Sequence, residues 1–96
     1  MDYYQNRARV LQNKIKMVLL NEWDPIGVRD IPEANDEYDA YVANIYKMLI
    51  SHKSIHEICD YLWEVETKYM GLIGSKKNTI NIAKRLLDVY ESVEEV

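Results

Sequence analysis

The sequence has 96 residues, of which 48% are hydrophobic and 29% are charged, and its formal net charge is −4. This length and mixed composition indicate one globular domain with a single core and argue against a disordered chain. The only cysteine, Cys59, cannot form an intramolecular disulfide and fits a reducing compartment, and no apolar run is long enough to cross a membrane. We therefore expect a cytoplasmic protein.

The charges are segregated along the chain. Residues 21–39 carry seven acids and one base, whereas residues 1–20 carry four bases and one acid. Nucleic acids bind to basic patches that replace phosphate counterions, so the acidic block argues against a nucleic-acid partner. It favours a basic protein instead, because complementary electrostatic fields accelerate encounter.

The first predicted element is an amphipathic helix over about residues 2–21. Apolar residues recur at steps of three and four from Tyr4 to Val18, which places them on one face of a helix. We expect Val10 and Met17 to widen this buried stripe.

An acidic loop follows, because Pro25 and Gly27 interrupt regular structure. Four apolar residues recur through it: Trp23, Ile26, Val28 and Ile31. We expect these side chains to hold the loop against the helices, so the loop should be ordered.

The second helix is predicted over about residues 36–51, with Asp36 or Asn35 as its N-cap. The third is predicted over about residues 54–70. Ser54 and Glu57 have the spacing of a capping box at its start, and Gly71 can end it in a left-handed conformation.

The apolar stripe of the third helix runs from Ile55 to Tyr69. The fourth helix is predicted to start near Ser75 or Asn78 and to run to about Ser92, with residues 78–92 as the preferred range. Lys76 and Lys77 would face the positive end of the helix dipole, which favours a start at Asn78.

No segment shows the sustained alternation with a period of two that marks a half-buried strand. The fold class predicted for residues 1–96 is therefore all-α, a single domain that forms a compact bundle of about four helices with an ordered acidic loop after the first. Short connections between the later helices favour antiparallel neighbours.

The acids Asp36, Glu37 and Asp39 do not make a convincing metal site. Hard cations need several oxygens that converge on one point, and Glu37 would point away from the other two on a helix. Favourable interaction with a helix N-terminus explains these charges without a ligand. We predict no catalytic residue, no metal site and no cofactor.

Four residues are predicted to be structural anchors: Trp23, Pro25, Tyr38 and Gly71. Trp23 suits a groove between helices, although an interface hot spot is the alternative. Trp63 stands off the apolar stripe of the third helix, near Glu64 and Glu66, and is the better candidate for contact with a partner.

Several motifs together resemble a known family. They are Asn21–Val28 (NEWDPIGV), Asp36–Asp39 (DEYD), Glu66, and Met70–Leu72 (MGL). Over roughly residues 15–90 the chain resembles the YugE-like family of short bacterial helical proteins, which includes immunity proteins of contact-dependent growth inhibition systems. The resemblance implies a helical fold, no catalytic residues, and a protein that binds and neutralises the C-terminal domain of a cognate toxin, expected to be a basic nuclease.

The residues predicted to contact this toxin are Glu22, Asp24, Asp30, Glu33, Asp36, Glu37, Asp39, Trp63 and Glu64. The main alternative is a housekeeping helical adaptor or regulator with no toxin partner. A small enzyme that uses the acidic cluster is a further alternative. No membrane partner is expected, and homo-oligomerisation is left open.

Overall fold

The computed structural model describes residues 3–24, 27, 30, 31, 33 and 36–94, with only the backbone described for residues 3–6 and 94. All regular secondary structure in this part of the chain is helical, so the predicted all-α fold is confirmed. In chain order the elements are α1 (Tyr3–Val18), the π-helix η1 (Leu19–Trp23), α2 (Asp39–Ile50), α3 (Ile55–Glu64), the π-helix η3 (Val65–Tyr69) and α4 (Lys76–Glu94).

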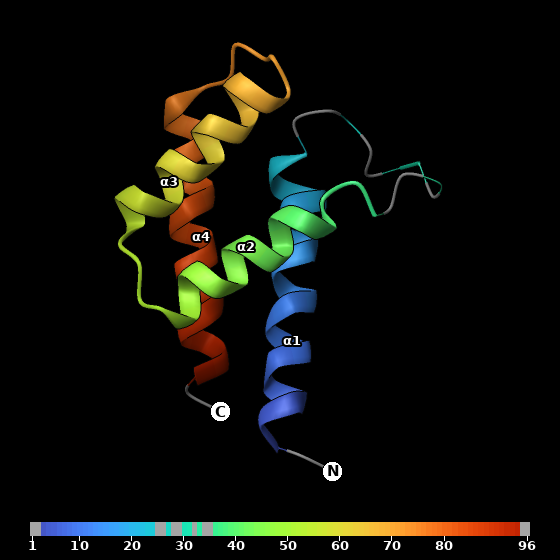
Figure 1. Cartoon of the computed structure of the whole chain (residues 1–96), viewed down its shortest axis with the longest axis vertical. Coiled ribbons are helices and arrows are strands. Elements are labelled where there is room, and N and C mark those ends of the chain that lie inside the picture. The colour runs from blue at the N-terminus through green and yellow to red at the C-terminus, as the bar shows by residue number, and fades with distance from the viewer. Residues whose placement is uncertain (1–2, 25–26, 28–29, 32, 34–35, 95–96) are drawn as a thin grey trace.

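The four α-helices form two layers. α1 and α4 lie side by side and run in opposite directions, and α2 and α3 pack against one face of this pair (Figure 1). The extents of 42 × 32 × 17 Å agree with this arrangement, since the short dimension has room for two layers of helices. None of the described helices covers the opposite face of the α1–α4 pair.

The hydrophobic core lies between the two layers and receives side chains from every helix. Ile15, Ile45, Leu62 and Leu86 come from α1, α2, α3 and α4, and none of them is exposed to solvent. The periodic stripes predicted from the sequence supply most of the core residues, which is why the number and the order of the helices are as predicted.

The first helix ends differently from the prediction. The helix continues past Val18 as a π-helical turn that ends at Trp23, and both Leu19 and Trp23 are buried. Val10 and Met17 do not widen the buried stripe. They are 45% and 55% exposed, since both lie outside the side of α1 that α2 and α4 cover.

A second π-helix, η3, overturns the predicted stripe of the third helix. Continued α-helical spacing would have placed Tyr69 inward, but its side chain is 73% exposed. Glu66, expected near the surface beside Trp63, is only 3% exposed. The π turn rotates Tyr69 outward, whereas Glu66, four residues after the buried Leu62, lies on the inward face of the helix.

The second helix starts later than predicted. Residues 36–38 form a turn in which the Asp39 N–H donates to the Asp36 carbonyl at 3.1 Å, and α2 begins at Asp39. Tyr38 takes the N-cap position, but its side chain makes no capping hydrogen bond. Packing of its buried ring fixes this end of the helix instead. Asn35, the alternative cap, lies outside the described residues.

The caps of the other helices explain their bounds. Ser54 Oγ accepts a hydrogen bond from the Glu57 N–H at 3.2 Å, so the predicted N-cap of α3 is confirmed. The start predicted for the fourth helix at Asn78 is wrong. Ser75 Oγ accepts from the Asn78 N–H at 3.3 Å, so the helix begins at Lys76. One satisfied backbone donor outweighs the weak, solvent-screened effect of the two lysines on the dipole.

Of the four apolar residues expected to hold the acidic loop, Trp23 is buried and Ile31 is 46% exposed. Ile31 therefore does not fix the loop, which is held at its two ends instead. Ile26 and Val28 lie outside the described residues, and so does the predicted anchor Pro25. Among the described helices, none is long and apolar enough to cross a membrane.

Candidate functional site

A buried carboxylate, that of Glu66, joins three segments of the bundle. The indole Nε1 of Trp23 donates to Glu66 Oε1, and the Thr79 hydroxyl lies 3.0 Å from Glu66 Oε2 and 3.2 Å from Oε1. Trp23 ends η1, Glu66 lies in η3, and Thr79 is in the first turn of α4. We call these three residues the Glu66 cluster.

Burial of a carboxylate is costly unless hydrogen bonds replace its water. Here the donors come from two side chains that are themselves buried, Trp23 at 5% and Thr79 at 0% exposure. Hydrogen bonds to a charged group are stronger than those between neutral groups. The Glu66 cluster therefore fixes the ends of both π-helices relative to α4.

A second side-chain contact closes the neck of the acidic loop. The Tyr38 hydroxyl donates to Asp24 Oδ1 at 2.9 Å. Asp24 has a left-handed backbone (φ 31°, ψ 56°), a conformation that the short polar side chain of Asp tolerates better than most. The Trp23 and Tyr38 rings pack with centroids 5.4 Å apart, and Tyr41 contacts both rings.

Residues 24–38, which we call the connecting segment, therefore begin and end at one place on the surface of the bundle (Figure 1). The structure thus brings the two ends of the segment together, and connecting segments at the surface of a protein frequently carry function. Asp24 belongs to this neck. It is a predicted partner-binding residue that the structure instead places in an internal contact.

Two further predicted contact residues form internal ion pairs. Arg85 Nε lies 3.2 Å from Glu22 Oε2, and Lys16 Nζ lies 3.0 Å from Asp39 Oδ1. All four side chains are at least a quarter exposed, so each pair adds little stability, on the order of 0.2–1 kcal/mol. These pairs reduce the negative field near Glu22 and Asp39.

The other acidic residues of the connecting segment that we predicted to contact a partner lie at the surface. Asp30, Glu33, Asp36 and Glu37 are all exposed. They belong to one closed loop, so the structure keeps part of the sequence-predicted acidic block together. Glu22, Asp24 and Asp39 each have a partner within the protein, which reduces the negative field near them.

Trp63 and Glu64 lie on α3, away from the connecting segment. The Trp63 ring is half-buried, and Lys76 Nζ lies 5.7 Å from its centroid, within the range of a cation–π contact. Glu64 is exposed and lies 3.8 Å from Lys68 Nζ. The described basic group at the Trp63 ring is therefore Lys76, and the prediction that Trp63 contacts a partner stays a prediction.

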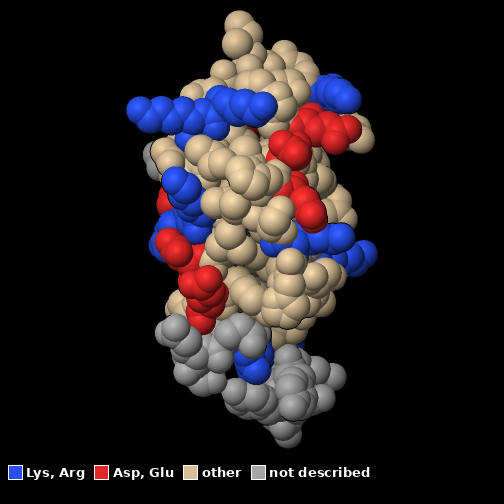
Figure 2. All heavy atoms as spheres, turned by 90° about the vertical axis from the view of Figure 1, so that its left-hand side faces the viewer, with Lys and Arg blue, Asp and Glu red and all other residues tan. Residues whose placement is uncertain are grey.

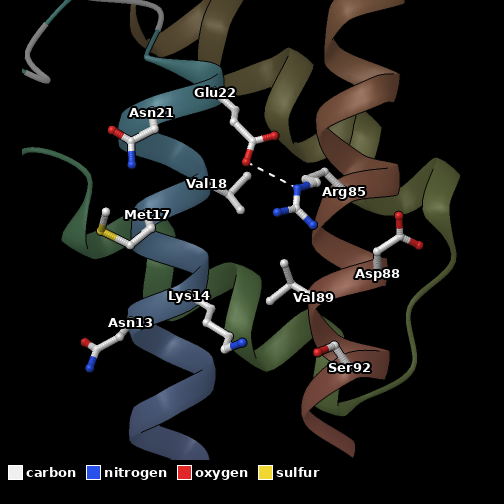
Figure 3. Close-up of a pocket in the computed structure, with 10 residues that line it drawn as sticks. All are labelled: Asn13, Lys14, Met17, Val18, Asn21, Glu22, Arg85, Asp88, Val89 and Ser92. Atoms are coloured by element: carbon white, nitrogen blue, oxygen red, sulfur yellow. Dashed lines mark hydrogen bonds and ion pairs between the residues drawn. The ribbon is translucent and has the colours of Figure 1, made fainter. Parts of the chain in front are cut away.

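A groove of about 530 Å³ runs between α1 and α4 on the face that α2 and α3 leave uncovered (Figure 3). Val18 and Val89 form its floor, Met17 lies at one edge, and the Glu22–Arg85 pair crosses one end. Its rim carries charges of both signs, so its electrostatics favour no single class of ligand.

The face of the molecule on the α3 side shows basic and acidic side chains interspersed around an uncharged band (Figure 2).

Among the described residues no group of three or more His, Cys, Asp or Glu could hold a metal ion. Burial and the neighbouring Asp60 raise the pKa of the Cys59 thiol, so this cysteine is a poor nucleophile near neutral pH.

Comparison with known proteins gave no match: no family model, no curated protein and no solved structure matches this chain. The resemblance to YugE-like proteins therefore stays a prediction.

Sequence reasoning missed the role of three residues, Glu66, Thr79 and Arg85. Each is polar and lies on a helix, where periodicity assigns it only to a face. The single signal was the presence of Glu66 among the motif residues of the resemblance. Its role becomes visible only when Trp23, 43 residues earlier, is placed beside it.

Proposed function

We propose that this chain is an immunity protein, which binds and neutralises a cognate bacterial toxin domain through protein–protein contact in the cytoplasm. The observation that carries the proposal is the connecting segment: a loop closed by the Asp24–Tyr38 contact that presents exposed acids outside its neck. A basic nuclease cleft is the surface that such a loop complements. The resemblance of the motifs to YugE-like immunity proteins adds independent support.

The closed neck matters for affinity because ordering a loop on binding costs conformational entropy. Asp24 and Tyr38 hold the two ends of the segment before any partner arrives, and the Glu66 cluster fixes Trp23 beside them. Glu33, Asp36 and Glu37 can then act as rim charges. Such charges raise the rate of association and make it depend on salt.

The deciding experiment expresses the C-terminal domain of an adjacent large secreted protein with and without this chain. Growth and co-purification are scored together. The proposal requires that the domain kills alone, and that this chain restores growth and forms a complex with it. Toxicity without rescue, or no toxicity, overturns the proposal and favours the adaptor alternative.

Matched variants locate the contact. The test variant neutralises three exposed acids of the connecting segment: E33Q, D36N and E37Q. The control neutralises three exposed acids of α3 and α4: D60N, D88N and E91Q. Both variants change the net charge equally, so only position distinguishes them.

We expect the test variant to associate with the toxin domain about tenfold more slowly at low salt, with a smaller difference at high salt. The control should stay within about twofold of the unaltered protein in the same measurement. An equal effect of both variants would show that net charge, and not this loop, governs association.

A further inference from the structure

The loop between η3 and α4 forms an exposed apolar projection. Ile73 is 93% exposed and Tyr69 is 73% exposed, the highest values among the exposed large hydrophobic residues of the described chain, and Leu72 is half-buried beside them. We call Tyr69, Leu72 and Ile73 the apolar tip. Exposure of a large apolar side chain such as Ile to water is unfavourable in free energy. An exposed apolar group of this kind therefore indicates a contact surface.

The base of this loop is fixed even though its tip is exposed. Gly71 and Gly74 adopt positive φ values of 69° and 71°, and the Leu72 N–H donates to the Glu66 carbonyl at 2.9 Å. A Cβ on Gly74 would come within 2.8 Å of Glu66 Oε2. The Glu66 cluster thus supports the loop from below, so the tip is held away from the core.

Basic side chains flank the apolar tip in sequence. Residues 67–87 contain five bases and no acid, although the whole chain is acidic. Three of these bases, Lys68, Lys76 and Lys77, flank the loop in sequence, and all three are exposed. We call them the basic collar. In Figure 2 the top of the molecule is an uncharged projection with basic side chains below it on both sides and acidic side chains next to the basic one on the right.

The collar has only weak internal partners. Lys68 Nζ lies 3.8 Å from Glu64, and both side chains are about half exposed or more. Lys76 Nζ stacks over the Trp63 ring at 5.7 Å. Exposed contacts of this kind are easily exchanged for others.

We propose that the apolar tip inserts into the surface of an anionic lipid bilayer while the basic collar contacts lipid phosphates. A bilayer interface supplies the two environments that the loop presents, an apolar phase and a layer of negative charge directly above it. Tyr69 suits the boundary between the apolar phase and the charged layer, because its ring is apolar and its hydroxyl is polar. The proposed contact is peripheral, since none of the described helices is long and apolar enough to cross a membrane.

The shape of the molecule favours a bilayer over an acidic protein. The tip lies at one end of the long axis, whereas the start of α1 and the end of α4 lie at the other end (Figure 1). A stable protein interface buries about 800 Å² on each partner, far more than three side chains provide. Insertion into lipid needs no shape-matched surface. The tip and collar are separate from the connecting segment, so this proposal goes beyond the proposed function and can fail independently of it.

The test is flotation with vesicles of phosphatidylcholine alone and of phosphatidylcholine with an equal amount of phosphatidylglycerol. We expect binding only to the anionic vesicles. Ile73→Ser should lower that binding about tenfold, since it removes the most exposed apolar group. Neutralising two collar residues, K76Q with K77Q, should lower it about 25-fold, since each lysine near an anionic surface contributes about fivefold.

Matched controls use residues away from the tip. Ile31→Ser removes another exposed isoleucine, and K14Q with K47Q removes two exposed lysines on other helices. Both control variants should bind the anionic vesicles as the unaltered protein does. Circular dichroism confirms that each variant is folded, which the exposure of these side chains leads us to expect.

A tryptophan reporter tests insertion directly. The fluorescence of the Ile73→Trp variant should shift to the blue with anionic vesicles and be quenched by brominated lipid, whereas Ile31→Trp should show neither change. Absent binding, equal binding to neutral vesicles, or unchanged binding of Ile73→Ser overturns the proposal. If vesicles do not bind but Ile73→Ser weakens a protein complex, the tip is a protein contact instead.

Discussion

Trp23 and Glu66 are joined inside the protein by a hydrogen bond from the indole N–H to a carboxylate that is only 3% exposed. Each residue lies in a π-helix, η1 or η3, and Thr79 completes the contact from α4. The bond therefore ties the end of the first helix to the end of the third. It also supports both surfaces that we propose as contacts, the connecting segment and the apolar tip.

Removal of the buried carboxylate should destabilise the protein. Glu66→Ala leaves the Trp23 N–H without its acceptor and opens a cavity, so we expect a loss of about 2–4 kcal/mol in the free energy of unfolding. Urea denaturation measures this. Glu64→Ala, two residues away and exposed, should cost less than about 0.5 kcal/mol. Equal effects of the two changes would contradict the assigned role.

Glu66→Gln should cost much less than Glu66→Ala. Its carbonyl can still accept from Trp23, and its amide can donate to the Thr79 hydroxyl, which can turn to the Ser75 carbonyl at 2.9 Å. A double-mutant cycle of Trp23→Phe with Glu66→Ala should give a coupling energy of about 1 kcal/mol or more. Additive effects would show that the two side chains stabilise the protein independently.

The neck of the connecting segment should depend on the Tyr38 hydroxyl. Tyr38→Phe keeps the buried ring but removes the donor to Asp24, so we expect a loss of about 1 kcal/mol and faster proteolysis within residues 24–38. Limited proteolysis with mass spectrometry locates the cleavage. Tyr69→Phe removes a hydroxyl from a side chain that is 73% exposed and should change neither property.

Substitution by alanine should lower stability by different amounts at two glycines that have the same backbone conformation. Gly71 and Gly74 have φ values of 69° and 71°, so each substitution carries a similar strain of about 1 kcal/mol. A Cβ at Gly71 meets no atom within 4 Å, whereas one at Gly74 meets Glu66 Oε2 at 2.8 Å and Trp63 at 3.2 Å. Gly74→Ala should therefore lower the urea midpoint more than Gly71→Ala, and the reverse order would contradict the packing at the loop base.

Stability should fall under alkaline conditions. Burial and Asp60 raise the pKa of Cys59 above its ordinary value of 9.0 in the folded state, so the folded protein retains a proton that the unfolded chain releases. This contribution is complete below pH 9.0 and is lost as the pH rises through the raised pKa. The urea midpoint should decline above pH 9.0, and Cys59→Ala should show a smaller decline. Burial also raises the pKa of Tyr61 above 10.0, which adds to the loss at higher pH.

The sequence alone determined the fold class, the order of the helices and most of the core. Steps of three and four between apolar residues record which face of each α-helix is buried, and Ser54 and Gly71 mark helix ends by local backbone chemistry. These features depend on residues only a few positions apart. They can therefore be read before any long-range contact is known.

Only the tertiary structure decided which polar residues are internal. The π-helix η3 changes the phase of the helical pattern, so Tyr69 turns outward against the α-helical period, and burial of the Glu66 carboxylate depends on its donors Trp23 and Thr79. The Glu22–Arg85 pair joins residues 63 positions apart, and the Glu66 cluster joins three elements. Such contacts form because packing brings distant donors and acceptors together, and local periodicity carries no information about partners at that separation.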